Sequence, residues 1–459
     1  MKRFLALFMT LVLTFALTAC GTGKGGNDGE KPDEKKPGAV KSLLGTEDVK
    51  ITFWHCASDE AGVLMDKYVK DFNETNKYGI TVNAIYQGQY SDATTLLKTM
   101  ISGGNFKELP DIMQMDATGK TTYINSGKAY TVDDALTNYP DDTLMGKYLS
   151  AALANWQFAG SQLGMPFATS TTVTYYNKDL LAKAGWTKAP DTFADVIALA
   201  KDMKAKGMTQ KAFQSVPNTP TLANWIGQLG SYVVNEKNGS TGIASELACI
   251  DNGALETFLT EWKAMYDAGA LVNENSSVDK FIAGEIALMT SSSSSVTSIL
   301  SKVNGAFDLG VGTYLRVNDK ASHGATISGS CLAMFDSGEA LKKEASWHFM
   351  QYLTSAEVQA DFAAGTGYTP ANTASVDDAA YKAVTSKYPQ YLLAFEQLNN
   401  TPKDMCSVTV GPSTDFYYAV MQCSSDMLKN KQTVKETIEI MSDELGNLLT
   451  EYVRNNTTK

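Results

Sequence analysis

The sequence predicts an α/β protein in which helices cover a parallel sheet. Short stretches with an apolar residue at every second position alternate with longer stretches whose apolar residues share one helical face. This order begins near residue 49 and again near residue 173, and the chain ends in mostly helical sequence. A length of 459 residues fits two such units better than one domain.

The first unit reads as strand, helix, strand, helix and strand. In its first helix Leu64, Tyr68 and Phe72 lie four residues apart and share a face. Gly103 and Gly104 end its second helix. The expected elements are 49–53, 60–75, 80–84, 92–101 and 109–113.

The second unit begins with a strand and continues in helices. Gly207 and Gly269 each follow a helical stretch, at the position where a left-handed residue commonly ends a helix. The expected elements are a strand at 173–176 and helices at 192–206, 255–268, 339–353, 355–364 and 433–452.

The first 20 residues read as an export signal. Lys2 and Arg3 precede an apolar run that is too short to span a bilayer comfortably. The run ends in Leu17-Thr18-Ala19-Cys20, which resembles the bacterial lipobox and implies a lipid on Cys20. Residues 21–45 hold few large apolar groups, so we expect a flexible tether there.

The charge balance excludes some partners. A net charge of −11 argues against binding nucleic acid through a broad basic surface. Arginine occurs only as Arg3, Arg316 and Arg454, and the first and last lie near the ends of the chain. Only Arg316 is left to bind a carboxylate or phosphate through bidentate hydrogen bonds, so an anionic ligand is disfavoured.

The remaining chemistry motifs are weak. Five cysteines follow Cys20 without a CxxC pair, and the chain has three histidines without HExxH, so we expect no metal and no cofactor. Cys406 and Cys423 could pair, although isolated buried thiols are the favoured state. A Cys next to its own base in sequence, as in His55-Cys56, rarely has the geometry of a nucleophile. No phosphate loop, dinucleotide fingerprint or nucleophile elbow occurs.

Loops that combine aromatic and short polar residues follow several expected strands. Ligands of open α/β sheets bind beyond the carboxyl ends of the strands. A sugar needs flat aromatic faces for its C–H surfaces and short polar groups for its hydroxyls. The loops that offer both are 54–59, 86–90, 115–118, 167–171, 291–295, 365–370 and 415–418.

These segments, in this order, resemble extracellular solute-binding proteins of ATP-driven importers, in the group that binds maltose, multiple sugars and glycerol phosphate. The resemblance runs from about Ile51 to Tyr452. The stretches that carry it are Phe53-Trp54-His55, Tyr86-Gln87-Gly88-Gln89-Tyr90, Leu109-Pro110-Asp111-Ile112, Pro166-Phe167, Tyr175-Tyr176-Asn177-Lys178-Asp179-Leu180, Phe281-Ile282-Ala283-Gly284-Glu285, Ala287-Leu288-Met289-Thr290, Thr366-Gly367-Tyr368-Thr369-Pro370 and Phe416-Tyr417-Tyr418-Ala419-Val420.

The resemblance implies a two-lobed, periplasmic-binding-protein-like fold of type II, hinged by crossing strands near 166–173, 310–317 and 365–370. One lobe would hold 46–168 and 315–367, and the other 169–314 and 368–459. The solute would sit in the cleft between them, and rotation about the hinge would bury it.

The resemblance also implies ligand-binding residues. Tyr417 stands where the glycerol phosphate binder has an arginine and maltose binders have a stacking aromatic, and it therefore favours a sugar. Trp225 is a further aromatic candidate, and Asp116 lies beside the position of an acidic contact. The expected ligand-binding set is Ser58, Asp59, Tyr90, Asp116, Thr169, Ser170, Trp225, Ser292, Ser293, Gly329, Tyr368 and Tyr417.

We therefore expect a non-enzymatic binding component of a carbohydrate importer, held on the outer face of a bacterial membrane through Cys20. It would be a monomer that delivers its sugar to permease subunits. The alternatives are a binder of glycerol phosphate diesters or a polyol, a secreted glycosidase, and a surface scaffold without a small ligand. The glycosidase stays open because a chain with 50 acidic residues always permits some pair of carboxylates.

Overall fold

The computed structural model describes residues 40–402, 404–429 and 432–457. The chain divides into Met1–Gly38 and Ala39–Lys459. The expected signal segment, Cys20 and most of the expected tether lie outside the described residues. Residues 40–45 are described, and they are not a free tether: the Val40 N–H donates to the Asn138 carbonyl and the Leu43 N–H donates to the buried Glu344 carboxylate.

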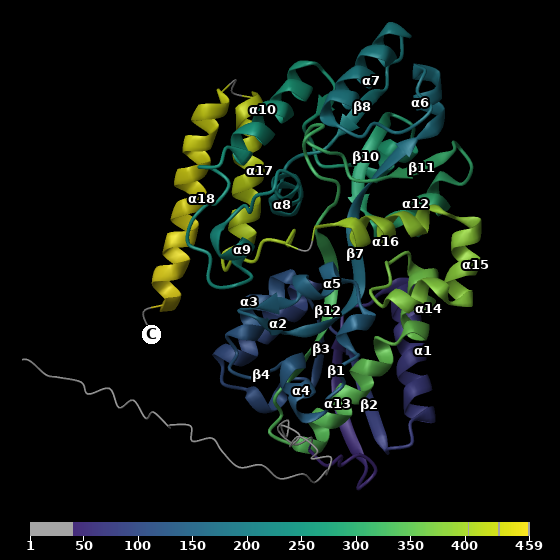
Figure 1. The fold of residues 1–459 in the computed structure, drawn as a ribbon, viewed down its shortest axis with the longest axis vertical. Helices are drawn as coiled ribbons and strands as arrows, with labels where there is room; N and C mark the ends of the chain where they lie inside the picture. Colours follow the sequence, from purple (N-terminus) through teal and green to yellow (C-terminus); the bar gives the residue numbers. More distant parts are fainter. Residues whose placement is uncertain (1–39, 403, 430–431, 458–459) are drawn as a thin grey trace, which may run out of the picture. The chain divides into compact units, whose positions relative to one another are not determined.

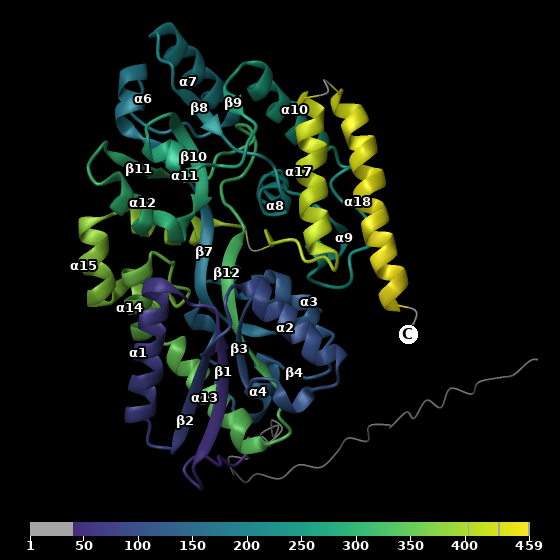
Figure 2. The same ribbon diagram turned by 180° about the vertical axis from the view of Figure 1, so that it is seen from behind.

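The structure is an α/β fold, as predicted, with helices on both faces of one sheet (Figures 1 and 2). Eight strands form the main path in the order β2-β1-β3-β12-β7-β10-β8-β9; β4 pairs with β12 and β11 pairs with β7. The strands of this sheet are β1 (Val49–His55), β2 (Ile80–Tyr86), β3 (Ile112–Asp116), β4 (Ala129–Tyr130), β7 (Gly164–Asn177), β8 (Lys211–Gln214), β9 (Leu271–Val272), β10 (Ile286–Ser292), β11 (Leu309–Gly312) and β12 (Ile327–Phe335).

Helices connect and cover these strands, and a small hairpin lies apart from the main sheet. The α-helices are α1 (Asp59–Thr75), α2 (Tyr90–Ser102), α3 (Lys120–Ile124), α4 (Val132–Asn138), α5 (Ser150–Asn155), α6 (Lys178–Ala184), α7 (Phe193–Ala205), α8 (Thr219–Gln228), α9 (Asn235–Gly239), α10 (Ala254–Asp267), α11 (Val278–Ile282), α12 (Val296–Val303), α13 (Ala340–Leu353), α14 (Ala356–Thr366), α15 (Ala379–Lys387), α16 (Gln390–Asn400), α17 (Ser413–Lys429) and α18 (Val434–Thr457). The hairpin is β5 (Gln157–Phe158) with β6 (Ser161–Gln162), and short 3₁₀ turns lie at Phe106–Glu108, Ala117–Gly119, Met145–Lys147, Ser293–Ser295 and Thr373–Asp377.

Alternation along the strands separates the core into layers. In β1, Phe53 packs with α1 and α13 on one face, and Trp54 packs with α2 on the other. A further large core lies among α7, α8, α10, α17 and α18, around Trp225 and Trp262. The fold therefore has two halves, each with its own apolar core.

Strand β7 joins the two halves. Its residues 164–171 pair with β12, and its residues 172–177 pair with β10 and β11. The main-chain N–H of Thr369 donates to the carbonyl of Thr169 over 2.7 Å, so a second segment meets β7 at the same level. This arrangement agrees with the expected two-lobed fold hinged by crossing strands.

Some segments pack with a different half from the expected one. Leu315, Val317 and Ala325 pack in the core of α7 and α10. The chain enters the sheet of the first half only at Ile327, where β12 begins. Tyr381 of α15 packs with Ala360 and Ala363 of α14, on the side of α1. The chain therefore passes between the halves near residue 326 and again after residue 388, in α16, where Tyr391 packs with the second half and Leu398 with the first core.

Candidate functional site

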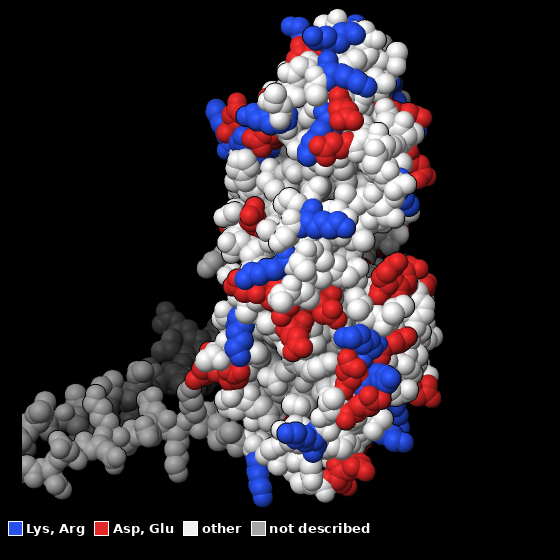
Figure 3. Space-filling view, turned by 90° about the vertical axis from the view of Figure 1, so that its right-hand side faces the viewer, with Lys and Arg blue, Asp and Glu red and all other residues white. Residues whose placement is uncertain are grey.

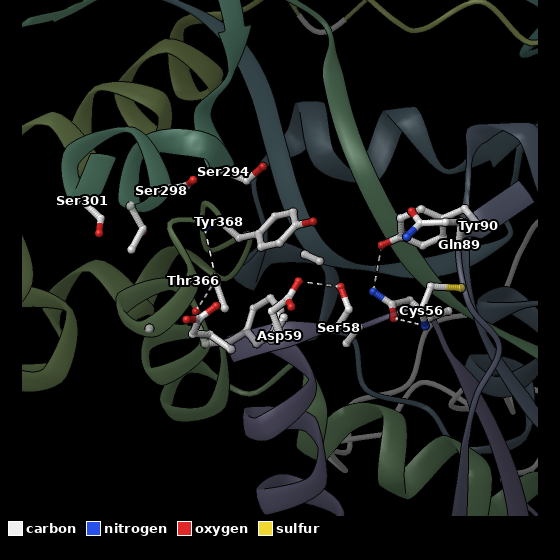
Figure 4. Close-up of a pocket in the computed structure, with 18 of the residues that line it drawn as sticks. Cys56, Ser58, Asp59, Gln89, Tyr90, Ser294, Ser298, Ser301, Thr366 and Tyr368 are labelled. Atoms are coloured by element: carbon white, nitrogen blue, oxygen red, sulfur yellow. Dashed lines mark hydrogen bonds between the residues drawn. The ribbon is translucent and has the colours of Figure 1, made fainter. Parts of the chain in front are cut away.

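A cavity of about 510 Å³ lies between the two halves of the sheet. One wall comes from the loop after β1, the start of α2, strand β3 and the end of α14, and the other comes from the 3₁₀ turn before α12 and from α12 itself. Figure 4 shows Tyr90 and Tyr368 entering this cavity from opposite sides. We call it the polar cavity; its lining residues that carry polar side chains are Cys56, Ser58, Asp59, Glu60, Gln89, Tyr90, Gln114, Ser294, Thr297, Ser298, Ser301, Lys302, Thr366 and Tyr368.

The loop after β1 brings the carboxylate of Asp59 to the rim of the polar cavity, on a residue whose backbone is strained. Asp59 begins α1 with a φ of +52°, a left-handed value that is uncommon outside glycine. Ser58 stands at the N-cap, but its hydroxyl donates to Asp59 Oδ2 over 3.2 Å and does not cap the helix. Both side chains are exposed, so they remain available to a solute.

A second cavity of about 230 Å³ adjoins the crossing strands. We call it the apolar cavity, because Ile327, Val408, Val410 and Pro220 line it together with Tyr417. The Tyr417 hydroxyl accepts a hydrogen bond from Asn218 Nδ2 over 3.3 Å, which fixes the direction of the ring. The remaining lining residues are Asp116, Ala117, Thr118, Asn155, Thr219, Ser328, Gly329, Ser407, Thr409 and Ser413.

Asp116 is the carboxylate of the apolar cavity. Burial raises the pKa of Asp116, and hydrogen bonds from the Thr118 hydroxyl (2.6 Å) and N–H (3.1 Å) oppose that rise. Both bonds hold one carboxylate oxygen, Oδ1, and the main-chain N–H of Gly119 is a further donor to this carboxylate.

Seven of the expected site residues line the two cavities. Ser58, Asp59, Tyr90 and Tyr368 line the polar cavity. Asp116, Gly329 and Tyr417 line the apolar cavity. Their contact with a ligand stays a prediction, but the fold brings them from six separate segments to the junction of its two halves.

Four expected residues lie behind the cavity walls. Thr169 and Ser170 are buried in β7, next to Ala168, which lines the polar cavity. The Ser293 hydroxyl accepts from the Thr171 N–H over 3.2 Å, and the Ser292 hydroxyl accepts from the Ser294 N–H over 3.3 Å. These two serines fold the turn, and their neighbour Ser294 is the one that lines the polar cavity.

Trp225 requires a correction. We expected it as an aromatic ligand contact, but it is 0% exposed and stacks with Phe258 and Tyr314 in the core of its half. Its indole N–H donates to the Leu315 carbonyl over 3.2 Å. Both the ring and the polar edge are therefore used inside the protein.

Arg316 lies in neither cavity. Its guanidinium bonds to the Asp191 carboxylate, with Nε at 3.1 Å, and Nη1 donates to the carbonyls of Asp319 and Ala321. Lys302 is the one basic residue that lines the polar cavity, and none lines the apolar cavity. No arginine lines either cavity, so none is placed to bind an anion there.

Chemistry other than binding finds little support in the described residues. Burial raises the pKa of Cys56 to about 12, which disfavours a thiolate. Cys406 and Cys423 are free, which confirms the expectation of isolated thiols. The part of the chain that the structure describes has no group of three or more His, Cys, Asp or Glu placed to hold a metal ion.

Comparison with known proteins identifies the family. Residues 67–391 match the model of the bacterial extracellular solute-binding proteins. The chain belongs to this family. As a member it is a binding protein and not an enzyme, so the glycosidase alternative is set aside.

Curated relatives and solved structures agree with that assignment. The chain is 25% identical over 367 residues to the sn-glycerol-3-phosphate-binding periplasmic protein UgpB of Yersinia enterocolitica, covering 77% of this chain and 81% of the relative. Its fold is similar to that of the sugar-binding protein MalE of Xanthomonas citri (TM-score 0.74, 18% identity, 90% of this chain and 100% of the other). It is also similar to that of UgpB of Mycobacterium tuberculosis in complex with glycerophosphocholine (TM-score 0.71, 19% identity, 89% and 100%).

The surface and the helices carry two further observations. On the face of Figure 3, acidic and basic side chains are interspersed and form no broad basic patch. Among the described helices, none has the length and apolar character needed to cross a bilayer.

Proposed function

We propose that this solute-binding protein captures a neutral carbohydrate between its two halves and delivers it to the permease of an ATP-driven importer. The observation that carries the proposal is the lining of the polar cavity: two phenols and a set of hydroxyls, drawn from both halves, with no arginine. Ring faces and neutral hydroxyls are what a sugar requires. Arg316, which could have held an anion, is bonded inside its own half.

Binding would proceed by closure of the halves. Strand β7 and the segment that leads into β12 pass between them, so a small change near residues 169–172 and 326–328 would rotate one half against the other. Closure would replace the water around the sugar with Tyr90, Tyr368 and the serines of α12. For a disaccharide of about 23 heavy atoms at about 0.3 kcal/mol each, the expected dissociation constant is about micromolar.

The boundaries of the lobes form part of the proposal. We place the first lobe at 40–170 and 326–388 and the second at 171–325 and 389–457. The packing of Leu315, Val317 and Ala325 with the second core, and of Tyr381 with α14, supports these limits over boundaries at 315 and 368.

The lipid anchor also remains a proposal. The lipobox-like Leu17-Thr18-Ala19-Cys20 supports a protein held by a lipid on the outer face of the membrane, as a monomer. Mass spectrometry of the mature chain from membranes tests it: the first residue should be Cys20 with a diacylglycerol. A Cys20→Ala chain that stays in the membrane fraction would contradict the anchor.

A second candidate ligand is a glycerol phosphate diester, because relatives of this chain are named for glycerol 3-phosphate and one was solved with glycerophosphocholine. The single cation of the polar cavity, Lys302, would have to hold the phosphate. A thermal-shift screen of the full chain over mono- and oligosaccharides, polyols and phosphate esters separates the two. Stabilisation by sugars alone supports the proposal, and stabilisation by phosphate esters alone overturns it.

A further inference from the structure

Gln114 lies at the base of the polar cavity and is 1% exposed. Its side chain has one carbonyl oxygen and one NH₂ group with two protons, and all of them are used. Oε1 accepts from the Cys56 N–H over 3.0 Å, and Nε2 donates to the Tyr90 hydroxyl and to the Ser330 hydroxyl, each over 3.0 Å. One side chain on β3 thus ties together the loop after β1, the start of α2 and strand β12.

The direction of each of these hydrogen bonds is determined. A rotated amide would place Nε2 against the Cys56 N–H, so that two donors would face each other. The single proton of the Ser330 hydroxyl goes to the Phe167 carbonyl at 2.9 Å, so Ser330 Oγ accepts from Gln114. The Tyr90 oxygen must likewise accept.

This leaves the phenolic proton of Tyr90 for a solute. Within the described part of the chain, the Tyr90 hydroxyl accepts from Gln114, and the Ser330 hydroxyl, which also lies beside the phenol, has its own proton on the Phe167 carbonyl. Burial raises the pKa of Tyr90, so the phenol keeps its proton at neutral pH. In Figure 4 the hydroxyls of Tyr90 and Tyr368 both point toward the interior of the cavity.

We propose that Gln114 is a positioning residue that turns the Tyr90 hydroxyl into an obligatory donor toward the ligand, so that this wall of the cavity selects solutes with an oxygen acceptor at that point, such as a sugar hydroxyl or ring oxygen. The inference deepens the proposed function and rests on it for the identity of the solute. It assigns the selectivity to a residue that need not touch the ligand.

The chain contains a matched control for a purely structural role. Gln359 of α14 is 4% exposed, and its amide is also hydrogen-bonded through both its oxygen and its nitrogen. Its Oε1 accepts from the N–H groups of Ala371 (2.6 Å) and Asn372 (2.9 Å), and its Nε2 donates to the Pro166 carbonyl over 3.0 Å. All of its partners are main-chain groups, so losing it costs stability without turning a cavity side chain.

The first test needs no ligand. The full chain is labelled with 3-fluorotyrosine, and the fluorine resonance of Tyr90 is assigned by its loss in Tyr90→Phe. Gln114→Met should shift this resonance, because the phenol oxygen loses its donor, and Gln359→Met should leave it in place. A resonance that stays in place in Gln114→Met, or that moves equally in both variants, overturns the inference.

The second test measures selectivity with maltose and glycerophosphocholine as probes in calorimetry. Gln114→Met should weaken binding of the probe that the wild type binds by about fivefold, as expected for one lost hydrogen bond. Tyr90→Phe should match it, and the double variant should lose no more. Gln359→Met should stay within about twofold of the wild type.

Gln114→Glu gives the sharpest contrast, because its size is nearly unchanged while its carboxylate can only accept. Tyr90 would then donate to Glu and lose its proton for the solute, so the affinity should fall at least as far as in Gln114→Met. Wild-type affinity in Gln114→Glu overturns the inference. If neither probe and no sugar in the screen binds the wild type, the proposed function fails, and the fluorine resonance still decides how Tyr90 is held.

Discussion

Lys120 and Thr409 form a hydrogen bond of 3.2 Å between the two halves of the fold, with the ammonium of Lys120 as the donor. Lys120 is 2% exposed, and its ammonium also donates to the Asn155 carbonyl over 2.9 Å. Its partners are neutral oxygens. Burial without a carboxylate lowers the pKa of Lys120 to about 8.

The buried lysine predicts a rise of stability with pH. Between about pH 8 and the ordinary lysine value of 10.5, the folded chain binds fewer protons than the unfolded chain. Lys120 should therefore contribute a rise in the free energy of unfolding through that window, of about 3 kcal/mol at most, and the full cost of the buried charge applies below pH 8. Burial also raises the pKa values of Cys331 and Cys406 nearby from the ordinary 9.0. Such thiols ionise only after unfolding and lower the free energy of unfolding above that pH, so the effect of Lys120 is read as a difference between two chains that both keep them.

Urea unfolding at several pH values between 7 and 10.5 measures this effect as the difference between wild type and Lys120→Met. The Lys120→Met chain should lack the rise, whereas Lys98→Met, which changes an exposed lysine, should keep it. Equal slopes in wild type and Lys120→Met would show that Lys120 does not titrate in the window.

Tyr417 and Tyr418 give a paired test of whether the bound sugar reaches into the apolar cavity. Tyr417 lines the apolar cavity, whereas its neighbour Tyr418 is 62% exposed and does not line it. Tyr417→Ala should weaken sugar binding by about 1 to 3 kcal/mol, because a central aromatic anchor contributes about that much. Tyr418→Ala should change it by less than about 0.5 kcal/mol. Unchanged affinity in Tyr417→Ala by calorimetry would remove this ring from the site.

The elements of the fold could be predicted because their signals are local. The four-residue spacing of Leu64, Tyr68 and Phe72 follows from one face of α1, and the structure buries Tyr68 and Phe72 there. No expected strand covered β12, which begins at Ile327, and the boundary between the halves remains a proposal. The long irregular segment before β12 has no regular spacing of apolar residues, so its sequence does not show which of the two cores it packs against.

The site was only partly predictable, because side-chain direction depends on distant partners. Five consecutive serines carry no signal that singles out Ser294, and the selection comes from the 3₁₀ turn that Ser292 and Ser293 hold in place. Trp225 reads as a candidate contact until Phe258 and Tyr314 are seen on either side of its ring. Gln114 went unnoticed because a single glutamine in a strand has no motif.

Asp59 predicts a separation of stability from binding. Replacement by glycine removes the strain of a φ of +52°, which offsets the greater freedom of glycine in the unfolded chain. Asp59→Gly should leave the free energy of unfolding within about 1 kcal/mol of the wild type and still weaken sugar binding.

Glu60→Gly is the matched control for the stability of Asp59→Gly, because Glu60 lies in the same turn with ordinary helical geometry; it also lines the polar cavity and is no control for binding. It should lose about 1 kcal/mol of stability. Urea unfolding and calorimetry on both variants measure the two effects. A large loss of stability in Asp59→Gly, or an unchanged sugar affinity, would contradict a binding role for its carboxylate.

Gly329 and Ala168 face each other at a bulge in the crossing strands. The register shifts between Gly329 and Ser330, and Ala168 has a φ of +49°. A Cβ on Gly329 would lie only 2.0 Å from the Ala168 carbonyl oxygen, and the φ of Gly329 is +97°. Gly329→Ala should therefore lower the free energy of unfolding by at least about 2 kcal/mol.

Gly338→Ala separates the clash from the backbone conformation, because Gly338 also has a positive φ, of +77°, with nothing within 4 Å of its added Cβ. It should cost about 1 kcal/mol, clearly less than Gly329→Ala. Adding Ala168→Gly to Gly329→Ala should not rescue the chain, since the clash is with a main-chain oxygen that the second change retains. Equal costs at the two glycines would mean that the crossing strands can move apart at the bulge.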